Sequence, residues 1–383
     1  MVNMAGIPSF STHRLPETAI QKRAEVREFL AQQRAAGTEF RSNSWTRVDR
    51  AFSEQCGTRG YIGATWPKVH GGQELSPIEQ FVVIEEMLAA GAPVGGHWLA
   101  DRQSGPQIIR FGSKRAKREI LPKIVAGRCC FAIGMSEPGA GSDLASVRTR
   151  ATRDNGGWRI NGRKIWTTNA HNAQYMTVLC RTEPGSERHA GLTQMIVALP
   201  NPAVTISAID NLAGEREFNE VAFDDCFVPD DMVLGEPGQG WMIVTSELAL
   251  ERSGPDRFMS TVPLLREAGA VVVDSQDERE VRRALGRMVA HLATLRAMSM
   301  SVGGMIESGQ SPNLQAAVVK DLGAVVEQEM VEAARDLIEE RASGIDQNLA
   351  EHYRRAVLEA PSFSLRGGTR EILRGIIGKS LAR

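Results

Sequence analysis

The stretch Gly134–Asp143 has the residue types best suited to binding a ligand, reading Gly-Met-Ser-Glu-Pro-Gly-Ala-Gly-Ser-Asp. Its glycines let the backbone approach a ligand closely. The hydroxyls of Ser136 and Ser142 stand beside backbone N–H groups that can face an anion or the polar edge of a ring. A cluster of Gly, Pro, Ser and Asp is also typical of an ordinary surface turn. Local composition leaves both interpretations open.

Other common catalytic patterns are missing. The hydrolase motif G-x-S-x-G fails because Pro138 stands where its final Gly is required. No G-x-G-x-x-G lies between a strand and a helix, so a Rossmann site has no support. The seven histidines form no H-E-x-x-H or H-x-H, and the five cysteines form no C-x-x-C. The sequence therefore predicts no metal site and reduced cysteines, as in a cytosolic protein.

Length and charge restrict the class of protein further. A chain of 383 residues with 42% hydrophobic and 24% charged residues is long enough for two or three domains with a large core. Its net charge of −1, with no basic block, argues against nucleic acid or an anionic membrane as partner. The N-terminus lacks the apolar core of a signal peptide, and no run approaches the ~18 apolar residues of a membrane span. We therefore expect a cytoplasmic protein with no membrane span.

Helical periodicity dominates from Pro16 to Ala126. In the first segment it predicts one buried helix face, made of Ile20, Val26, Phe29 and Leu30. A second helix is predicted with Ser76 as its cap, Pro77 as its first residue and Gly91 just past its end.

From Cys129 to about Val233 the pattern is typical of β-structure. The segment GWRINGRKIWTT predicts two strands joined at Asn161-Gly162, the strongest short hairpin signal. Further strands are expected in QYMTVLCRT, LTQMIVALP and EVAFDDCFV.

Long Ala- and Leu-rich segments then predict bundle helices over 278–307 and 313–342. The order helix, β, helix predicts an α+β fold. We expect an N-terminal helical domain over 1–127, a middle β-barrel or sandwich domain over 128–235 and a C-terminal helical bundle over 236–383.

The stretch GMSEPGAGSDLAS resembles the first signature of the acyl-CoA dehydrogenase family. Four further segments resemble that family in the expected order, so the resemblance spans nearly the whole chain. They are GATWPKVHGG from Gly63 to Gly72, then INGRKIWTTNA, EVAFDDCFVPDDMVLGEPGQGW and, near the C-terminus, GGTREILRGIIG.

The resemblance implies the cofactor FAD, an acyl-CoA substrate and roles for individual residues. Met135 and Ser136 would contact the pyrimidine edge of the flavin, and Gly141 and Ser142 would line its pyrophosphate and the substrate thioester. The other implied cofactor contacts come from two later segments: Trp166, Thr167 and Thr168, and, near the C-terminus, Thr369 and Glu371. An isolated Trp in a strand is more often an ordinary core residue, but the surrounding Lys-Ile-Trp-Thr-Thr-Asn favours the flavin contact.

The catalytic base is where the sequence departs from most of the family. The reaction needs a desolvated carboxylate to take the α-proton while hydride leaves Cβ. Most members supply it from a Tyr-Glu-Gly-Thr segment, which here reads Arg366-Gly367-Gly368-Thr369. Gly367 has no side chain, so that mechanism does not transfer.

Isovaleryl- and long-chain-type members instead place the base in a Leu-Glu-Arg context on a helix after the β-domain. This chain has Leu250-Glu251-Arg252 there, and Glu251 is the predicted base. Glu247, one turn earlier, would raise the pKa of Glu251 by like charge, and Pro255 would disturb the helix. The alternative for Glu251 is a solvated helix carboxylate. Arg252 would orient Glu251 and the substrate, or lie on the surface.

The segments with which the family usually holds the FAD tail across a subunit interface are also altered. Neither Arg-x-x-Phe-Gly nor Gln-x-x-Gly-Gly occurs in the matching regions, VVVDSQDEREVRRALGRM and LIEERASGIDQN. This erosion resembles the heterotetrameric acyl-CoA dehydrogenases of actinobacterial steroid catabolism. The family resemblance implies a tetramer and an electron-transfer flavoprotein as electron acceptor, and the altered segments favour the α2β2 type over a tetramer of identical chains.

Three functions are compatible with these residues. The first is FAD-dependent α,β-dehydrogenation of an acyl-CoA to the trans-2-enoyl-CoA, in fatty-acid or steroid side-chain catabolism. The second is a non-catalytic partner subunit of a heterotetrameric dehydrogenase, which the retained Ser136, Trp166 and Thr168 disfavour. The third is a flavin oxidase or N-hydroxylase on the same fold.

Overall fold

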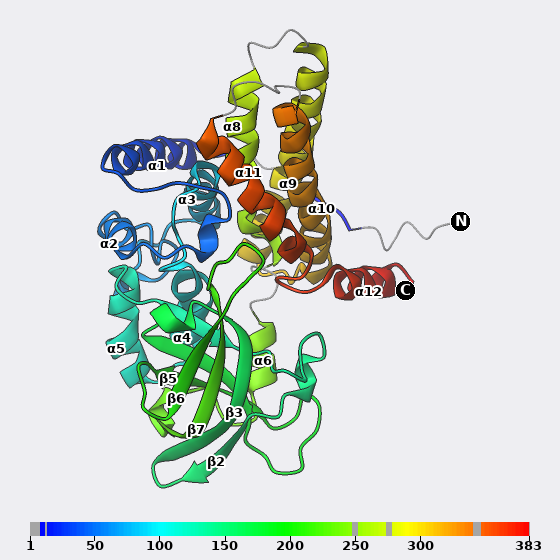
Figure 1. Cartoon of the computed structure of the whole chain (residues 1–383). Coiled ribbons are helices and arrows are strands. Elements are labelled where there is room, and N and C mark those ends of the chain that lie inside the picture. The colour runs from blue at the N-terminus through cyan, green and yellow to red at the C-terminus, as the bar shows by residue number, and fades with distance from the viewer. Residues whose placement is uncertain (1–7, 12–13, 247–251, 273–277, 340–345, 383) are drawn as a thin grey trace. The chain divides into compact units, whose positions relative to one another are not determined.

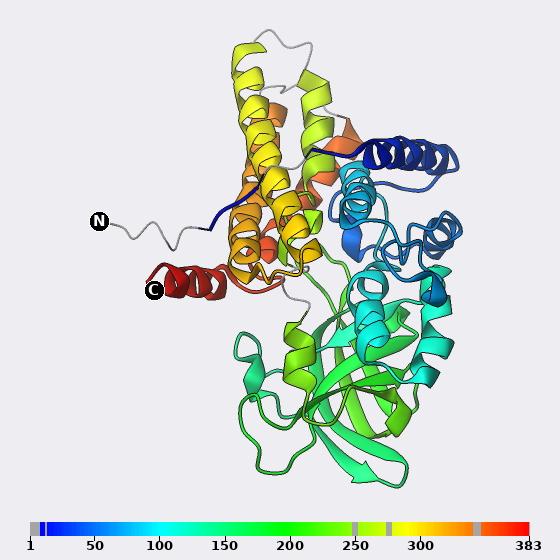
Figure 2. The same cartoon turned by 180° about the vertical axis from the view of Figure 1, so that it is seen from behind.

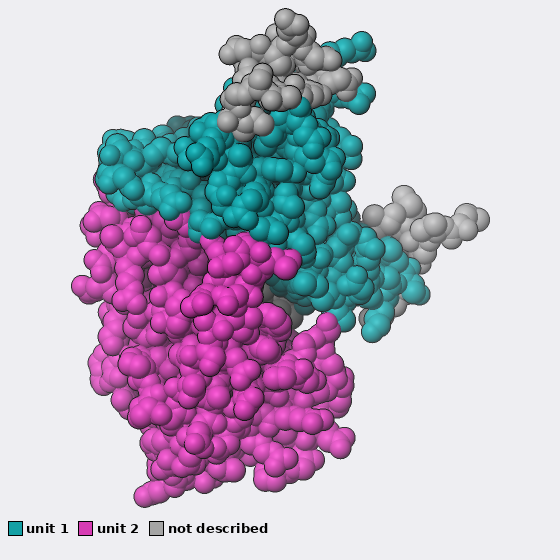
Figure 3. Space-filling model, viewed as in Figure 1, with its two compact units in different colours: residues 1–45, 76–92, 249–383 teal, residues 46–75, 93–248 magenta. Residues whose placement is uncertain are grey.

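The structure is a computed structural model that describes residues 8–11, 14–246, 252–272, 278–339 and 346–382. The chain divides into two compact units (Figure 3). Unit 1 combines Met1–Trp45, Ser76–Ala92 and Ala249–Arg383, and unit 2 combines Thr46–Leu75 and Pro93–Leu248. Segments far apart in the sequence therefore share each unit.

Unit 1 is helical (Figures 1 and 2). Its α-helices are α1 (Glu17–Ala35), α3 (Pro77–Ala90), α8 (Val262–Val272), α9 (Glu278–Glu307), α10 (Asn313–Glu339), α11 (Gln347–Glu359) and α12 (Arg370–Leu381). The 3-10 turns η8 (Pro255–Arg257) and η9 (Ala360–Ser364) connect them. Helix α10 packs against α8, α9 and α12 and forms the centre of the unit. The predicted long helices over 278–307 and 313–342 are thus confirmed as α9 and α10, the second ending at Glu339.

Local sequence signals set the ends of α3 as predicted. Ser76 and Glu79 form a capping box, Pro77 opens the helix, and Gly91 follows it in the left-handed conformation. The prediction for α1 is only partly correct. Val26, Phe29 and Leu30 are buried, but Ile20 is 47% exposed and Ala19 is buried instead. The buried face is therefore rotated from the one that the apolar pattern indicates.

Unit 2 contains the sheet and four α-helices among its described residues. The helices are α2 (Arg50–Thr58), α4 (Gly105–Phe111), α5 (Lys114–Val125) and α6 (Gly240–Thr245). The strands are β1 (Phe131–Gly134), β2 (Arg150–Asp154), β3 (Gly157–Thr168), β4 (Tyr175–Arg181), β5 (Leu192–Ala198), β6 (Val204–Ile209), β7 (Phe218–Pro229) and β8 (Val233–Leu234). The eight-stranded sheet has the order β6-β7-β3-β2-β4-β5-β8, and β1 pairs in parallel with β4.

The predicted hairpin at Asn161-Gly162 is wrong. Strand β3 runs through these residues from Gly157 to Thr168. The turn lies earlier, at Asn155-Gly156, where antiparallel β2 and β3 meet. Gly162 instead sits at an irregularity of the β3–β7 register, at φ +149°, and a side chain there would begin 2.6 Å from Thr149 Oγ1. Both dipeptides are Asn-Gly, and strand pairing decides which of them turns.

The described residues contain no helix that is both long and apolar enough to cross a membrane. All five cysteines are free and buried. Burial raises the pKa of the Cys129, Cys130 and Cys180 thiols to about 12, so these thiols are protonated at neutral pH. Because the thiolate is the nucleophile, these cysteines are unsuited to nucleophilic catalysis.

Candidate active site

The segment Met135–Ser136 leaves the end of β1 and is held against β3 by two hydrogen bonds. Ile165 N–H donates to the Ser136 carbonyl at 2.9 Å. The Lys164 ammonium donates to the Met135 carbonyl at 3.0 Å. Met135 and Ser136 are half-buried. These bonds place two predicted flavin contacts directly beside the strand that carries Trp166.

The Lys164–Glu137 ion pair beneath this segment is a feature that the motif comparison did not single out. Lys164 Nζ lies 2.8 Å from Glu137 Oε1, and the side-chain exposures are 0% and 7%. The other hydrogen bonds of the Glu137 carboxylate come from the backbone N–H groups of Arg148, at 2.6 Å, and Thr149, at 2.9 Å. Glu137 therefore ties the start of the glycine-rich loop to its far end. The sequence gives no local signal for this pair, because its two residues lie 27 positions apart on separate segments.

The two charges of the pair respond differently to burial. Burial would raise the pKa of Glu137, but the Lys164 ammonium and the hydrogen bonds outweigh it and lower that pKa below its usual range. Burial lowers the pKa of Lys164, and Glu137 offsets part of that effect. Each charge of the pair depends on the other, because water is excluded from both side chains.

Trp166 stands on a bulge of β3. Between Lys164 and Thr167 the β3–β7 register shifts, and Trp166 has φ +57°. A positive φ is uncommon for a bulky residue, and bulges re-aim side chains next to active sites. The indole is 57% exposed and meets Phe218 edge to face, at 5.9 Å between ring centroids. Trp166 is therefore a presented aromatic surface and not the core residue that a lone strand Trp would suggest.

The two threonines after Trp166 lie in different environments. Thr167 is fully buried, and its hydroxyl has no hydrogen-bond partner among the described residues. Thr168 is half-buried. Asn219 Nδ2 holds the Thr167 carbonyl at 2.9 Å and fixes the end of β3. Of the two hydroxyls, that of Thr168 is the better placed to reach a ligand.

The rest of the glycine-rich loop is open. Gly141 and Ser142 are exposed, and a side chain at Gly141 would meet no atom within 4 Å. Asp143 pairs with Arg188 at 2.9 Å. Below the loop lies a core cluster of Ala140, Val147, Leu179, Leu192 and Val244. The loop thus has a fixed base and free backbone facing outward.

In unit 1, the C-terminal segment begins α12. Thr369 is its N-cap residue, and its hydroxyl accepts from Ile372 N at 3.5 Å. Thr369 is half-buried and Glu371, in the first turn, is exposed. Both are available to a ligand at this helix end.

The turn before α12 is fixed by a half-buried arginine. Arg366 Nη2 lies 2.8 Å from Glu327 Oε2, and the Glu327 side chain is fully buried. The same nitrogen donates to Ser260 Oγ at 2.7 Å. Nearby, Lys320 donates to the Phe363 carbonyl at 2.7 Å. Burial, reinforced by the neighbouring arginines, lowers the pKa of Lys320 to about 7.

Two further arginines approach the Gly367-Gly368 turn. Gly367 has φ +67°, and a side chain there would begin 2.9 Å from the guanidinium carbon of Arg257. A side chain at Gly368 would begin 3.7 Å from Arg252 Nη2. Arg252 is half-buried, so it is not a fully solvated surface residue. The predicted base, Glu251, lies outside the described residues, but its neighbour Arg252 reaches the turn that lacks the usual base.

Three family descriptions match the chain in order. They are "Acyl-CoA dehydrogenase, N-terminal domain" over residues 16–128, "middle domain" over 132–226 and "C-terminal domain" over 265–382. The chain belongs to the acyl-CoA dehydrogenase family. The predicted α+β fold, helical at both ends with a sheet between, is thereby confirmed, and so is the enzyme class.

Similar proteins include several from actinobacteria. The chain is 34% identical over 372 residues to the acyl-CoA dehydrogenase IpdE1 of Mycobacterium tuberculosis, covering 93% of this chain and 95% of the relative. The ChsE4–ChsE5 complex from the same species has a chain with a TM-score of 0.82 and 29% identity, over 97% of this chain and 99% of that one. The Tcur3481–Tcur3483 steroid acyl-CoA dehydrogenase gives a TM-score of 0.83 and 27% identity, over 96% and 97%.

Proposed function

We propose that this acyl-CoA dehydrogenase uses FAD to convert an acyl-CoA thioester to the trans-2-enoyl-CoA. The observation that carries the proposal is Trp166, a large aromatic presented on a strained strand bulge beside Ser136. An exposed indole held in an unfavourable backbone conformation has no role in the core. It is suited to packing against a planar ring.

The residues of unit 2 fit a flavin in their donors and in their open space. Half-buried Met135 and Ser136 offer backbone and hydroxyl groups to a polar ring edge, and Thr168 offers a hydroxyl on the same strand as Trp166. Gly141 and Ser142 leave exposed backbone for a pyrophosphate. When bound, the flavin supplies the acceptor for the hydride that leaves Cβ of the substrate.

We propose Glu251 as the base that takes the α-proton. Support comes from the turn at Gly367-Gly368, which carries no carboxylate and lies next to Arg252. A carboxylate one residue before Arg252 would be carried by the same chain segment. The Arg252 cation would orient it, and would hold the electron-rich thioester oxygen as the proton leaves. By resemblance to the family, Ser142 would contribute to the thioester region, and Thr369 and Glu371 would contribute to cofactor binding.

Two measurements test this assignment. The purified protein, alone or with a partner chain, should show flavin absorption and release FAD on denaturation. Glu251→Gln should keep FAD and acyl-CoA binding but slow flavin reduction by substrate at least ~10²-fold, because an amide cannot accept the proton. Near-normal reduction by this variant removes Glu251 from the mechanism, whereas a colourless protein in every complex removes the enzyme function itself.

We further propose an α2β2 assembly with an electron-transfer flavoprotein as acceptor, in the cytoplasm, and acyl-CoAs from fatty-acid or steroid side-chain catabolism as substrates. Support comes from the missing tail-binding segments and from similarity to two complexes that are each named by two chains. The retained flavin-site residues make this chain a catalytic subunit in that assembly. Sedimentation of the chain expressed alone, with flavin counted per subunit, tests the assembly. A homotetramer with one tightly held FAD per chain that turns over acyl-CoA overturns it.

A further inference from the structure

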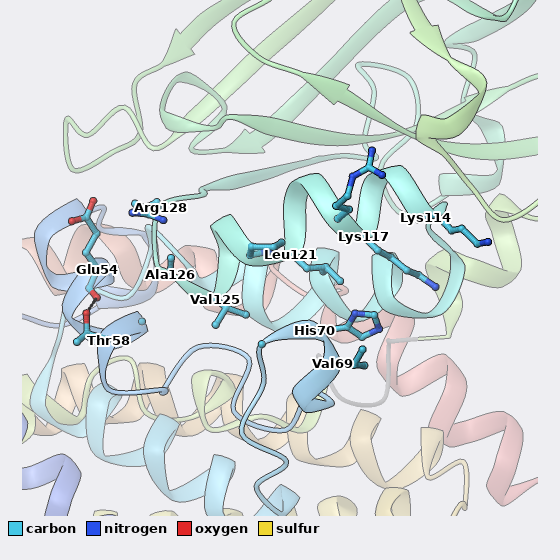
Figure 4. A pocket seen from close by; sticks show the side chains of 14 residues that line it. Glu54, Thr58, Val69, His70, Lys114, Lys117, Leu121, Val125, Ala126 and Arg128 are labelled. Carbon is cyan, nitrogen blue, oxygen red and sulfur yellow. Dashed lines mark hydrogen bonds between the residues drawn. The ribbon is translucent and has the colours of Figure 1, made fainter.

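A cavity of about 830 Å³ lies in unit 2, away from every residue assigned above. Its walls come from α2, α5, the residues that follow these helices, and the short turn η3 (Lys68–His70) (Figure 4). Small-molecule sites typically measure about 300–1,000 Å³. The volume is therefore that of a ligand site and exceeds a packing defect.

Helix α5 presents one mixed face to this cavity. The lining positions 114, 117, 118, 121, 122 and 125 recur at helical spacing. The first of them are cations, Lys114, Lys117 and Arg118, and the later ones are apolar, ending at Val125. From Lys114 to Val125 the face is roughly 16 Å long. One end is positively charged and the remainder is apolar.

The cations at this end converge from two elements. Figure 4 shows His70 of η3 directed toward Lys117, with Lys114 farther along α5. Neither lysine forms an ion pair within the described part of the chain. By contrast, Arg115 on another face of the helix pairs with Glu119 and Asp231. No acidic residue stands in the first turn of α5. Two lysine charges therefore face the cavity without a counter-ion.

The apolar part of the lining combines a buried floor with accessible walls: Leu121 is 1% exposed, Val125 is half-buried and Pro122 is exposed. Val69 on the η3 side is 84% exposed, although it lines the cavity opposite Leu121 and Val125. Glu54 and Arg128 lie at the far end (Figure 4). Accessible apolar groups from two elements, Val69 on one side and Pro122 with Val125 on the other, therefore line one hollow together with the lysines, and this combination marks a binding surface.

We propose that this cavity binds an amphipathic anion, a carboxylate or phosphate head on an unbranched apolar chain. The head lies between Lys114, Lys117 and His70, and the chain runs between Val69 and the apolar part of α5 formed by Pro122 and Val125. Both parts are required: the lysines supply charge and the apolar stripe supplies buried area. The site is separate from the proposed flavin and thioester residues, so its ligand is an effector and not the substrate being dehydrogenated.

The test uses the whole purified protein with its FAD and any partner chain. Isothermal titration with decyl phosphate, decanoate, decanol and inorganic phosphate separates head from chain. We expect both decyl anions to bind at least tenfold more tightly than decanol or inorganic phosphate. Lys114→Glu with Lys117→Glu should weaken the anions about tenfold or more. Val69→Ser should weaken the decyl anions and leave inorganic phosphate unchanged.

Lys123→Glu, a single charge reversal on α5 outside the cavity, controls for the charge of the helix and should bind as wild type does. The double lysine variant should keep its flavin and its rate of flavin reduction by acyl-CoA, because neither lysine belongs to the proposed catalytic residues. Equal binding of decyl phosphate and inorganic phosphate reduces the site to an anion patch and overturns the proposal. So does equal binding of decanol and decanoate, unchanged binding by the double variant, or no binding of either decyl anion.

Discussion

Replacing Lys164 by Met tests whether the buried ion pair positions the flavin-site segment. The change keeps the length of the side chain and removes its charge. It deletes two hydrogen bonds, to the Met135 carbonyl and to Glu137. Charge-assisted hydrogen bonds contribute about 1.5–3 kcal/mol each. Leaving the Glu137 carboxylate buried without its cation should bring the loss of unfolding free energy to about 3–5 kcal/mol.

A double-mutant cycle separates the pair from general damage to the sheet. Glu137→Gln removes the charge that Lys164 neutralises, so the double variant should be about 2 kcal/mol more stable than the sum of the single changes predicts. Arg163→Met is the matched control on the same strand. Its side chain is 66% exposed and lies 3.5 Å from Glu220, so its loss should cost less than about 1 kcal/mol.

Urea unfolding supplies the free energies, and flavin retention with the flavin absorption maximum supplies the functional readout. The Lys164→Met variant should lose FAD under conditions in which it remains folded. The Met135 carbonyl loses its hydrogen bond to Lys164, and only the Ser136 carbonyl stays bonded to β3. If it binds FAD normally and loses less stability than Arg163→Met, the ion pair does not position the site.

Three further changes probe the same units. Asp101→Asn keeps an acceptor for the Gly63 N–H, which Asp101 Oδ1 accepts at 2.7 Å, while removing a carboxyl whose pKa burial raises from 3.8 to about 6. An acid whose pKa is raised in the folded state stabilises the fold below about pH 4 and loses that contribution as the pH rises to about 6. The unfolding free energy of wild type, measured by urea titration, should therefore fall by up to roughly 3 kcal/mol relative to the variant over this window. Unfolding free energies that change in parallel with pH would contradict this expectation. Gly367→Ala should destabilise the fold by about 1–3 kcal/mol, because of the positive φ at this position and the close approach of Arg257. In thermal unfolding, adding Arg257→Ala should change that cost. If the effects of the two substitutions simply add, the two residues are not in contact. Trp166→Ala should leave the stability of the fold nearly unchanged, because the side chain is largely exposed, but it should weaken FAD retention. Unaltered FAD affinity would show that the indole does not touch the flavin.

Sequence alone determined the elements whose signals are local. The capping box and glycine at the ends of α3, the long helices α9 and α10, and strands β4, β5 and β7 all follow from residues within a few positions of one another. The sequence does not distinguish strands β1, β2, β6 and β8 individually, since short strands such as β1 and β8 give little periodicity. The family was also recognisable from the sequence, because its motifs are contiguous stretches whose order survives without knowledge of the fold.

Tertiary structure decided what depends on residues distant in sequence. Two Asn-Gly pairs are equal as turn signals, and the pairing of β3 with β7 selected Asn155-Gly156 for the turn. Lys164 looks like a surface residue in the sequence, yet β-sheet burial and Glu137, 27 positions away, make it a buried cation. The exposure of Trp166 follows from a register shift against β7, and the arginines beside Gly367 come from more than a hundred residues earlier. Burial and long-range pairing set the charge and direction of these side chains, and neither property is encoded in a local stretch of sequence.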